Sequence, residues 1–317
     1  MIKITSLLVT LLCLGLMPAE AQFARTYVSA ASGNDANDCN RLTPCRTFQK
    51  AHDSTLAAGE VTVLDPGGYG ALTIAKAISV INDGIGEAGV LVSGGLNGIT
   101  VTAGPNDAVS LRGLTVKGIG FGGGNGIVFN AGGSLIVENC AIRTLDGSSG
   151  GLGIWFQPNA SSHLGVLDTI VADNTGSGIA IVPRGSGSVA ASLSSVQVIN
   201  NGLVGFGVQT GLGGSTATIN AVVEEALAAK NGTAGFYAST IGTQPANLML
   251  IRSVAAHNGT GILSEKNATL RIGQSTVAAN AISWRTNTGG ILQSYGDNHI
   301  DSNGDGDPAI PTVIAKK

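Results

Sequence analysis

Three charged residues are placed where they could act together on a polymer. Asp168, Glu225 and Arg252 occupy the same position in three units of an internal sequence repeat. If successive units stack about 4.8 Å apart, the carboxyl groups of Asp168 and Glu225 are separated by roughly 9–10 Å. This is close to the upper end of the separation in an inverting glycosidase, and Arg252 could bind a substrate carboxylate. We favour the alternative of solvated turn residues, on which an exposed Glu225–Arg252 pair contributes little.

A second set of residues is suited to binding. Trp155 and Tyr237 are expected on equivalent outward positions three units apart, roughly 14 Å at about 4.8 Å per unit. Ala180 and Gly207 are the small residues between them, so the four positions predict a shallow trough whose aromatic rings can stack on sugar rings. The alternative interpretation is that an inserted loop or a neighbouring subunit covers these side chains.

One segment has ligand types that suit calcium. Residues 301–306 match the opening of an EF-hand loop, with Asp301, Asn303 and Asp305 at the first, third and fifth positions and a glycine at the sixth. Position twelve is Thr312 rather than the bidentate glutamate, so we expect a polar turn, with calcium as the weaker alternative. We predict no other cofactor.

A repeat of 22 to 30 residues must position all of these side chains. Each unit has alternating apolar residues, a short turn, a second alternating pair and then a glycine or alanine followed by more alternating apolar residues. The second apolar positions are Leu111, Val137, Val166, Leu193, Val223, Leu250 and Ile272. The later small residues are Gly126, Gly153, Gly178, Gly205, Gly235, Gly261 and Ala281.

Each unit therefore predicts three short strands that cannot bury their apolar faces alone. Stacked units pair every strand in parallel with its equivalent in the next coil and bury the ladders in a common core. The predicted fold is all-β: a single-stranded right-handed parallel β-helix with a short N-terminal capping helix.

Asparagines recur three residues after the last apolar position of the second strand of each unit. An asparagine tolerates left-handed backbone geometry, and its amide can hydrogen-bond the stacked asparagine of the next coil. This spacing predicts an asparagine ladder at a turn, made of Asn174, Asn201, Asn231, Asn258 and Asn280.

The chain divides into three parts. Residues 1–21 have a positive charge, an apolar run and a small-x-small cleavage site, which indicates a signal peptide. Residues 22–60 are the expected cap, with a Cys39–Cys45 disulfide and a helix from about Thr47 to Ala58. Residues 61–317 are the expected β-helix, with Trp284 pointing inward in the last full coil and a closing strand over 291–300.

Composition excludes several classes of protein. Glycine accounts for 48 of 317 residues, charged residues for 12 % and hydrophobic residues for 43 %, which argues against disorder and assigns the glycines to turns. The net charge of −3 lacks the basic bias of a nucleic-acid-binding protein. No apolar run after the signal is long enough to span a membrane. We therefore expect no nucleic-acid partner, no membrane span in the mature chain and a periplasmic, cell-surface or secreted location.

The beginning and the end of the mature chain resemble those of exported bacterial proteins of the pectate-lyase-like β-helix superfamily. The resemblance rests on segments that include Tyr27-Val28-Ser29, Thr43-Pro44-Cys45-Arg46-Thr47-Phe48, Asp65-Pro66-Gly67-Gly68-Tyr69-Gly70 and Ser294-Tyr295-Gly296-Asp297-Asn298. It implies the fold. The catalytic segments of similar polygalacturonases and the aspartate-rich calcium site of the pectate lyases are absent from this sequence.

We therefore expect an exported, non-catalytic β-helix protein that meets polysaccharide or another surface polymer. One alternative is a polysaccharide lyase or glycoside hydrolase that acts on uronic-acid polymers. The other is a structural protein that associates with itself on a surface.

Overall fold

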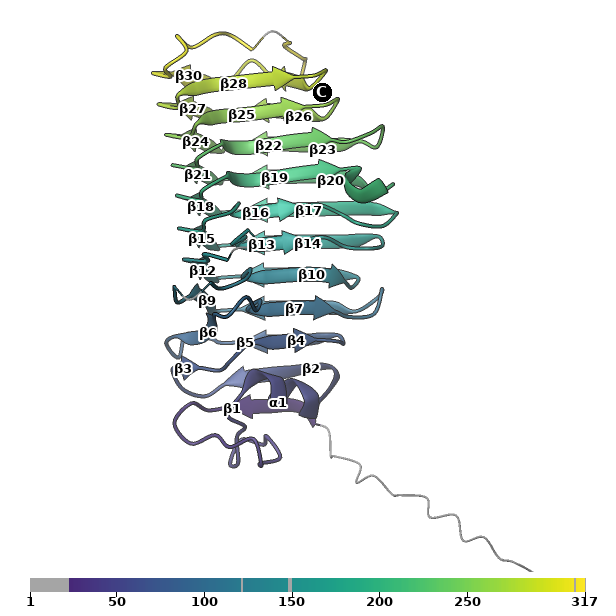
Figure 1. Ribbon diagram of the computed structural model, residues 1–317, viewed down its shortest axis with the longest axis vertical. Helices are drawn as coiled ribbons and strands as arrows, with labels where there is room; N and C mark the ends of the chain where they lie inside the picture. Colours follow the sequence, from purple (N-terminus) through teal and green to yellow (C-terminus); the bar gives the residue numbers. More distant parts are fainter. Residues whose placement is uncertain (1–22, 121, 148–149, 311, 317) are drawn as a thin grey trace, which may run out of the picture.

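The chain winds into a stack of coils whose walls are three parallel β-sheets (Figure 1). The structure is a computed structural model that describes residues 23–120, 122–147, 150–310 and 312–316. The expected signal peptide, residues 1–21, lies outside the described residues. After the first strand, each complete coil contributes one strand to sheet A, one to sheet B and one to sheet C, in that order along the chain.

The sheets contain eleven, ten and nine strands. Sheet A consists of β1 (Phe23–Val28), β2 (Thr55–Val63), β5 (Ile78–Ile81), β8 (Ala108–Arg112), β11 (Ser134–Glu138), β14 (Ser162–Leu167), β17 (Ser188–Ser194), β20 (Thr218–Glu224), β23 (Ala246–Ile251), β26 (Thr269–Gly273) and β29 (Ile291–Ser294). Sheet B consists of β3 (Gly67–Gly68), β6 (Ala88–Val92), β9 (Leu114–Gly118), β12 (Ala141–Arg143), β15 (Ile170–Ala172), β18 (Gln197–Ile199), β21 (Leu227–Ala229), β24 (Val254–Ala256), β27 (Thr276–Ala278) and β30 (His299–Asp301). Sheet C consists of β4 (Leu72–Ile74), β7 (Ile99–Thr102), β10 (Ile127–Ala131), β13 (Ile154–Phe156), β16 (Ile179–Ile181), β19 (Val204–Thr210), β22 (Ala234–Thr240), β25 (Thr260–Glu265) and β28 (Ile282–Asn287). Helix α1 (Phe48–Ser54) and the 3₁₀ turn η1 (Leu212–Gly214) are the helical elements among the described residues.

The apolar repeat forms the core, as predicted from its period. Val137, Val166, Leu193, Val223 and Leu250 stand opposite one another in successive strands of sheet A, and each is at most 2 % exposed. Burying one such side chain contributes on the order of 1.5–3 kcal/mol. The coils before residue 109 follow the same register, although their uneven loop lengths had hidden the repeat.

The turns on both sides of sheet B contain columns of non-glycine residues with left-handed backbone geometry. Between sheets A and B these are Asn139, Asp168, Ser195, Glu225, Arg252 and Gln274, with φ between 46° and 55°. Between sheets B and C they are Thr144, Asp173, Asn200, Lys230, His257, Ala279 and Ser302, with φ between 53° and 61°. We expected left-handed geometry at the ladder asparagines. It lies one residue earlier, which leaves each asparagine side chain free to turn inward.

The asparagine ladder forms and is one step longer than predicted. The side-chain nitrogen of each member donates to the side-chain oxygen of the next at 2.9–3.0 Å, from Asn174 through to Asn303. The ladder also explains the glycines that precede the apolar residues of sheet C. A Cβ at Gly205 would lie 2.7 Å from Nδ2 of Asn231, so a larger residue there would collide with the ladder.

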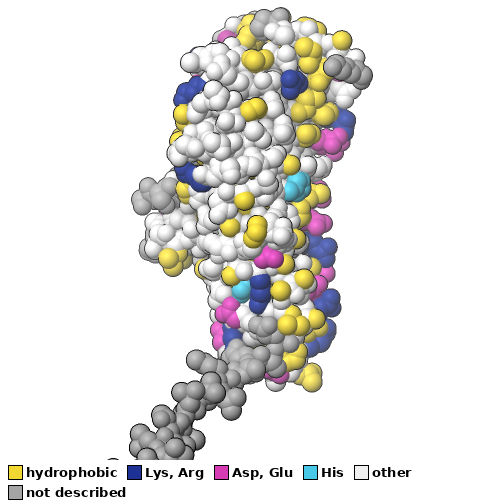
Figure 2. Space-filling view, turned by 90° about the vertical axis from the view of Figure 1, so that its right-hand side faces the viewer, with side chains coloured by type: hydrophobic (Ala, Val, Ile, Leu, Met, Phe, Trp, Pro, Cys, Tyr) yellow, Lys and Arg dark blue, Asp and Glu magenta, His cyan; other side chains and the backbone are white. Residues whose placement is uncertain are grey.

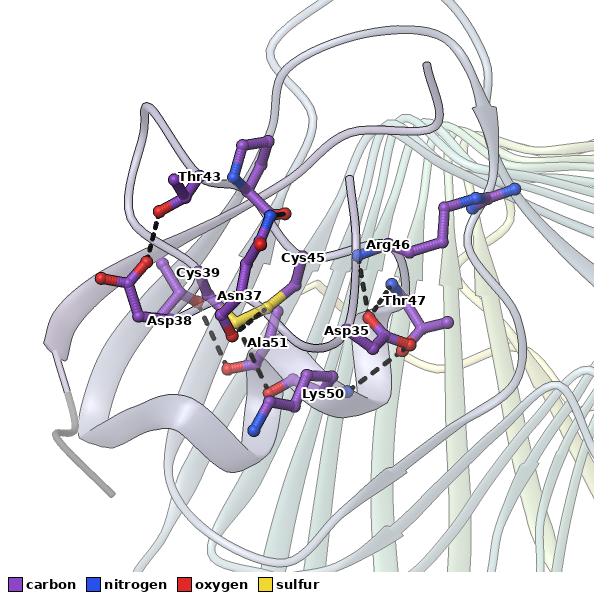
Figure 3. Close-up of a disulfide and its surroundings, with 12 residues drawn as sticks. Asp35, Asn37, Asp38, Cys39, Thr43, Cys45, Arg46, Thr47, Lys50 and Ala51 are labelled. Atoms are coloured by element: carbon purple, nitrogen blue, oxygen red, sulfur yellow. Dashed lines mark hydrogen bonds between the residues drawn. A yellow bond between two sulfur atoms is a disulfide. The ribbon is translucent and has the colours of Figure 1, made fainter. Parts of the chain in front are cut away.

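The N-terminal end is closed by a disulfide-bonded loop and α1 (Figure 3). Cys39 and Cys45 form the disulfide, and the carboxylate of Asp35 accepts hydrogen bonds from the backbone nitrogens of Arg46 and Thr47. The predicted helix is wrong beyond Ser54. Residue 55 enters β2 instead, because that segment pairs with β1 on one side and β5 on the other.

The C-terminal end differs from the sequence prediction in two respects. Trp284 points inward opposite Ile262, two residues out of step with the repeat, so Ser283 rather than Ala281 takes the place of the glycine. The expected closing strand over 291–300 is two strands, β29 and β30, in different sheets. Among the described residues, no helix is long and apolar enough to cross a membrane.

Candidate functional site

A groove of about 950 Å³ runs along the outward face of sheet A near the C-terminal end of the coils. Its apolar lining includes Val222, Met249 and Ile251 from strands β20 and β23, with Ile314 from the segment that follows β30. Figure 2 shows a molecule with sparse charge over the side that faces the viewer, and hydrophobic side chains gathered along one edge near this end. A concave, mostly apolar surface of this size is typical of a ligand-binding site.

Polar side chains in register line the groove. The Asn247 side-chain nitrogen donates to the Asn220 side-chain oxygen at 3.0 Å, one coil apart. One column further, Nε of Arg271 donates to Oε1 of Gln293 at 2.9 Å. This bond fixes the orientation of the Arg271 side chain. Arg271 also belongs to the lining of the groove. Amides and a guanidinium above an apolar floor can bind hydroxyl and carboxylate groups.

The segment 312–316 forms one wall of the groove. The backbone nitrogen of Ser294 donates to the carbonyl of Thr312, and that of Ile314 donates to the carbonyl of Ser294, both at 2.9 Å. Lys316 pairs with Asp297 at 2.7 Å, and this interaction holds the pKa of the Asp297 carboxyl below its usual range. Asp297 is therefore a carboxylate at neutral pH, already paired with a cation.

The predicted trough lies on a different face, the outward side of sheet C. Trp155, Ala180, Gly207 and Tyr237 stand opposite one another in four successive strands. Both aromatic side chains are half-buried. The Tyr237 ring leans toward Gly207, where a Cβ would lie 3.4 Å from the ring, so the trough is shallower than the sequence suggests.

Each trough aromatic has a charged neighbour. The Arg184 guanidinium lies 5.6 Å from the ring centroid of Trp155, and its Nε donates to Oε1 of Gln157 at 3.1 Å. The Tyr237 hydroxyl donates to Glu265 at 3.0 Å, and burial raises the pKa of that tyrosine. The outward column beside the rings is mostly polar, with Val182 between Gln157 and Gln209. Its long polar side chains are Asn130, Gln157, Gln209, Glu265 and Asn287.

The structure brings together only part of the proposed acid–base set. Arg252 bridges two neighbouring carboxylates, Glu225 with its Nε at 3.3 Å and Glu224 with its terminal nitrogen. Asp168 stands two coils away, with Ser195 between them. All three predicted residues are exposed turn residues, and none lines the groove. Sequence reasoning did not identify Glu224, which the strand alternation places outward one residue earlier.

The calcium candidates are engaged in hydrogen bonds with the protein. Asn303 is the last member of the asparagine ladder, and its side-chain nitrogen also donates to Asp307 at 2.8 Å. Asp305 accepts from the backbone nitrogen and hydroxyl of Ser283, at 3.0 and 2.8 Å. Asp301 is exposed at the end of β30. Across the described residues, no group of three or more His, Cys, Asp or Glu side chains could hold a metal ion.

Sequence reasoning missed the groove, although part of its signal was readable. The outward positions of sheet A follow directly from the inward ladder, so the stacked Asn220 and Asn247 pair could have been found. The wall formed by residues 312–316 could not have been found from the sequence, because that segment has no repeat pattern.

Comparison with known proteins supports the fold. No model of a known protein family matches the chain, and no curated protein does. Among solved structures, the pectate lyase Pel9A is similar with a TM-score of 0.68 at 17 % identity, over 92 % of this chain and 78 % of that one. The A-module of the Azotobacter vinelandii mannuronan C-5 epimerase AlgE4 has a TM-score of 0.43 at 12 % identity, over 82 % and 91 % of the two chains. The chain shares the parallel β-helix fold of Pel9A, and a shared fold does not assign a function.

Proposed function

We propose that the protein is exported and binds a polysaccharide, or another surface polymer, in the groove on sheet A without cleaving it. The groove itself carries the proposal. Its apolar floor can contact the C–H faces of sugar rings, while the amides of Asn220 and Asn247 can bind hydroxyl groups. Arg271 adds a cation that favours polymers with carboxylate groups. The disulfide supports export, because such bonds persist in oxidising compartments.

The carboxylate of the groove argues against a glycoside hydrolase, which needs a general acid. A general acid must hold a proton near the working pH. Asp297 is the carboxylate among the described residues of the groove lining, and its lowered pKa keeps it ionised. Its partner Lys316 neutralises it, so the pair is suited to fixing the wall rather than to transferring a proton.

The test is a binding and cleavage panel with purified mature protein. Neutral and uronic-acid polysaccharides are assayed by affinity electrophoresis and calorimetry, and each mixture is read for unsaturated products and new reducing ends. We expect Arg271→Gln to weaken the binding of an acidic polymer about tenfold or more, because a hydrogen bond to a charged group contributes about 1.5–3 kcal/mol. The same change at the far end, Arg41→Gln, is the control.

The outcomes separate the candidate sites and activities. If Trp155→Ala lowers the affinity and Arg271→Gln does not, the polymer lies in the trough on sheet C. Unsaturated products or new reducing ends would show a lyase or a hydrolase and would overturn the non-catalytic proposal. Failure of every polysaccharide to bind would reject the proposed function.

A further inference from the structure

The outward face of sheet B is apolar over most of its length, although no other element of the described chain covers it. Ile170 is 44 % exposed, and its neighbours on this face are half-buried by one another. The side chains alternate with the buried ones along each strand, so they form two straight columns. The apolar members of the sheet B face are Ala141, Ile170, Ala172, Ile199, Leu227, Ala229, Val254, Ala256 and Ala278. The polar members of this face, from β12 to β27, are Arg143, Gln197 and Thr276.

Charged residues at the two ends and along the two edges of this face are placed in an ordered way. Consider a line across sheet B between β18 and β21. Three basic side chains each have a matching carboxylate the same number of coils away on the other side of this line. Lys117 on β9 corresponds to Asp301 on β30, Asp168 before β15 to Arg252 before β24, and Asp173 after β15 to His257 after β24.

This pattern is the one that a twofold axis requires. Suppose that two copies face each other through sheet B and that the axis lies between them, parallel to the strands and between β18 and β21. It then places β15 of one copy against β24 of the other, and β9 against β30. Each pair named above then brings together residues of opposite or complementary charge. The remaining charged residues face neutral ones. Glu225 meets Ser195, Lys230 meets Asn200, and Arg143, which is exposed on β12 within the face, meets Ala278. A twofold axis along the coil stack would instead oppose Asp168 to Asp173.

We propose that two copies of this chain form an antiparallel dimer through the sheet B face. The columns meet at the centre, with Ile170 against Val254, Ile199 against Ala229 and Gln197 against Leu227 of the second copy. The groove on sheet A and the trough on sheet C stay open on the two other faces. The dimer is thus independent of the proposed polymer binding and would double the number of binding sites per particle.

The surface area buried between the two copies limits the affinity of the dimer. Eight coils at about 4.8 Å span roughly 34 Å, and five residues across the strand and its turns span about 16 Å. Each copy therefore buries roughly 500 Å², about 1,000 Å² in total, at the lower limit for specific interfaces. The dimer should form and dissociate with protein concentration.

Sedimentation velocity over a range of concentrations tests the proposal with a matched pair of variants. Ile170→Arg places two charges in the apolar centre, and we expect it to weaken dimerisation at least tenfold. Ile291→Arg changes an isoleucine that is also 44 % exposed, but on sheet A, and should leave the dimer unchanged. Circular dichroism confirms that both variants fold.

Charge exchange tests the antiparallel arrangement. Lys117→Asp and Asp301→Lys should each weaken the dimer several-fold, while the double variant restores it, because the axis brings each residue against the other. A monomer at every concentration would overturn the proposal. So would equal dimerisation of the two isoleucine variants, or a double variant no stronger than the single ones.

Discussion

Replacing Asn231 by alanine removes the middle of the asparagine ladder. Its side-chain nitrogen donates to Val198 at 3.0 Å and to Asn258 at 2.9 Å, and its oxygen accepts from the backbone and side-chain nitrogens of Asn201 at 3.2 and 3.0 Å. Asn201, Asn231 and Asn258 are at most 3 % exposed. The alanine leaves two donors of Asn201 without their acceptor in a place that water does not reach.

Each orphaned buried donor costs about 1–3 kcal/mol, so Asn231→Ala, which orphans two, should lower the free energy of unfolding by about 2–6 kcal/mol. Asn231→Asp should be at least as destabilising, because the nitrogen becomes an oxygen that faces the acceptors of Val198 and Asn258. The control is Asn200→Ala, one residue earlier and exposed, which loses a surface hydrogen bond to Asp173. Asn200 has left-handed backbone geometry, and Ala279 adopts the same geometry at the equivalent turn three coils later. We expect it to cost about 1 kcal/mol or less.

Urea denaturation followed by circular dichroism measures all three variants. If Asn231→Ala is no less stable than Asn200→Ala, the ladder contributes no net stability and our account of the glycines beside it also fails. If Asn231→Asp has the same free energy of unfolding as the wild type, the hydrogen bonds of the Asn231 side chain do not stabilise this turn.

Three further predictions concern stability and reactivity. Val166→Asp buries an unpaired charge in the core and should prevent folding, whereas Thr115→Asp, on an outward position, should be tolerated; equal thermal midpoints would refute the register. Burial lowers the pKa of His52, so below about pH 6.5 the unfolded chain takes up a proton that the folded chain resists. Stability should therefore fall from pH 7.5 to 5.5, and less so in His52→Gln; an equal fall in both excludes this residue. Burial raises the pKa of the Cys140 thiol to about 11, so alkylation should require unfolding, and labelling of native protein would contradict this.

The columns along the coils were predictable because each depends on a short local period. The inward position of Val166 and the outward positions of Trp155 and Tyr237 follow from strand alternation alone. Where the period lapses, prediction failed: Trp284 is two residues out of step, and the helix gives way to β2 at residue 55. At the C-terminal end, β28 is an edge strand that pairs with β25 alone, and at the N-terminal end, β2 pairs with β5 and with β1, which has no counterpart in the sequence repeat.

The sequence by itself determined the coil, its core and the turn that holds the asparagines, since those contacts join equivalent residues of adjacent repeats. Only the tertiary structure decided where the candidate sites lie. It paired Arg252 with Glu224 as well as with Glu225, directed Asn303 into the ladder, and brought residues 312–316 against sheet A to make the groove. The physical reason is that these outcomes depend on side-chain hydrogen bonds and on the return of a segment without periodicity, and neither leaves a regular pattern in the sequence.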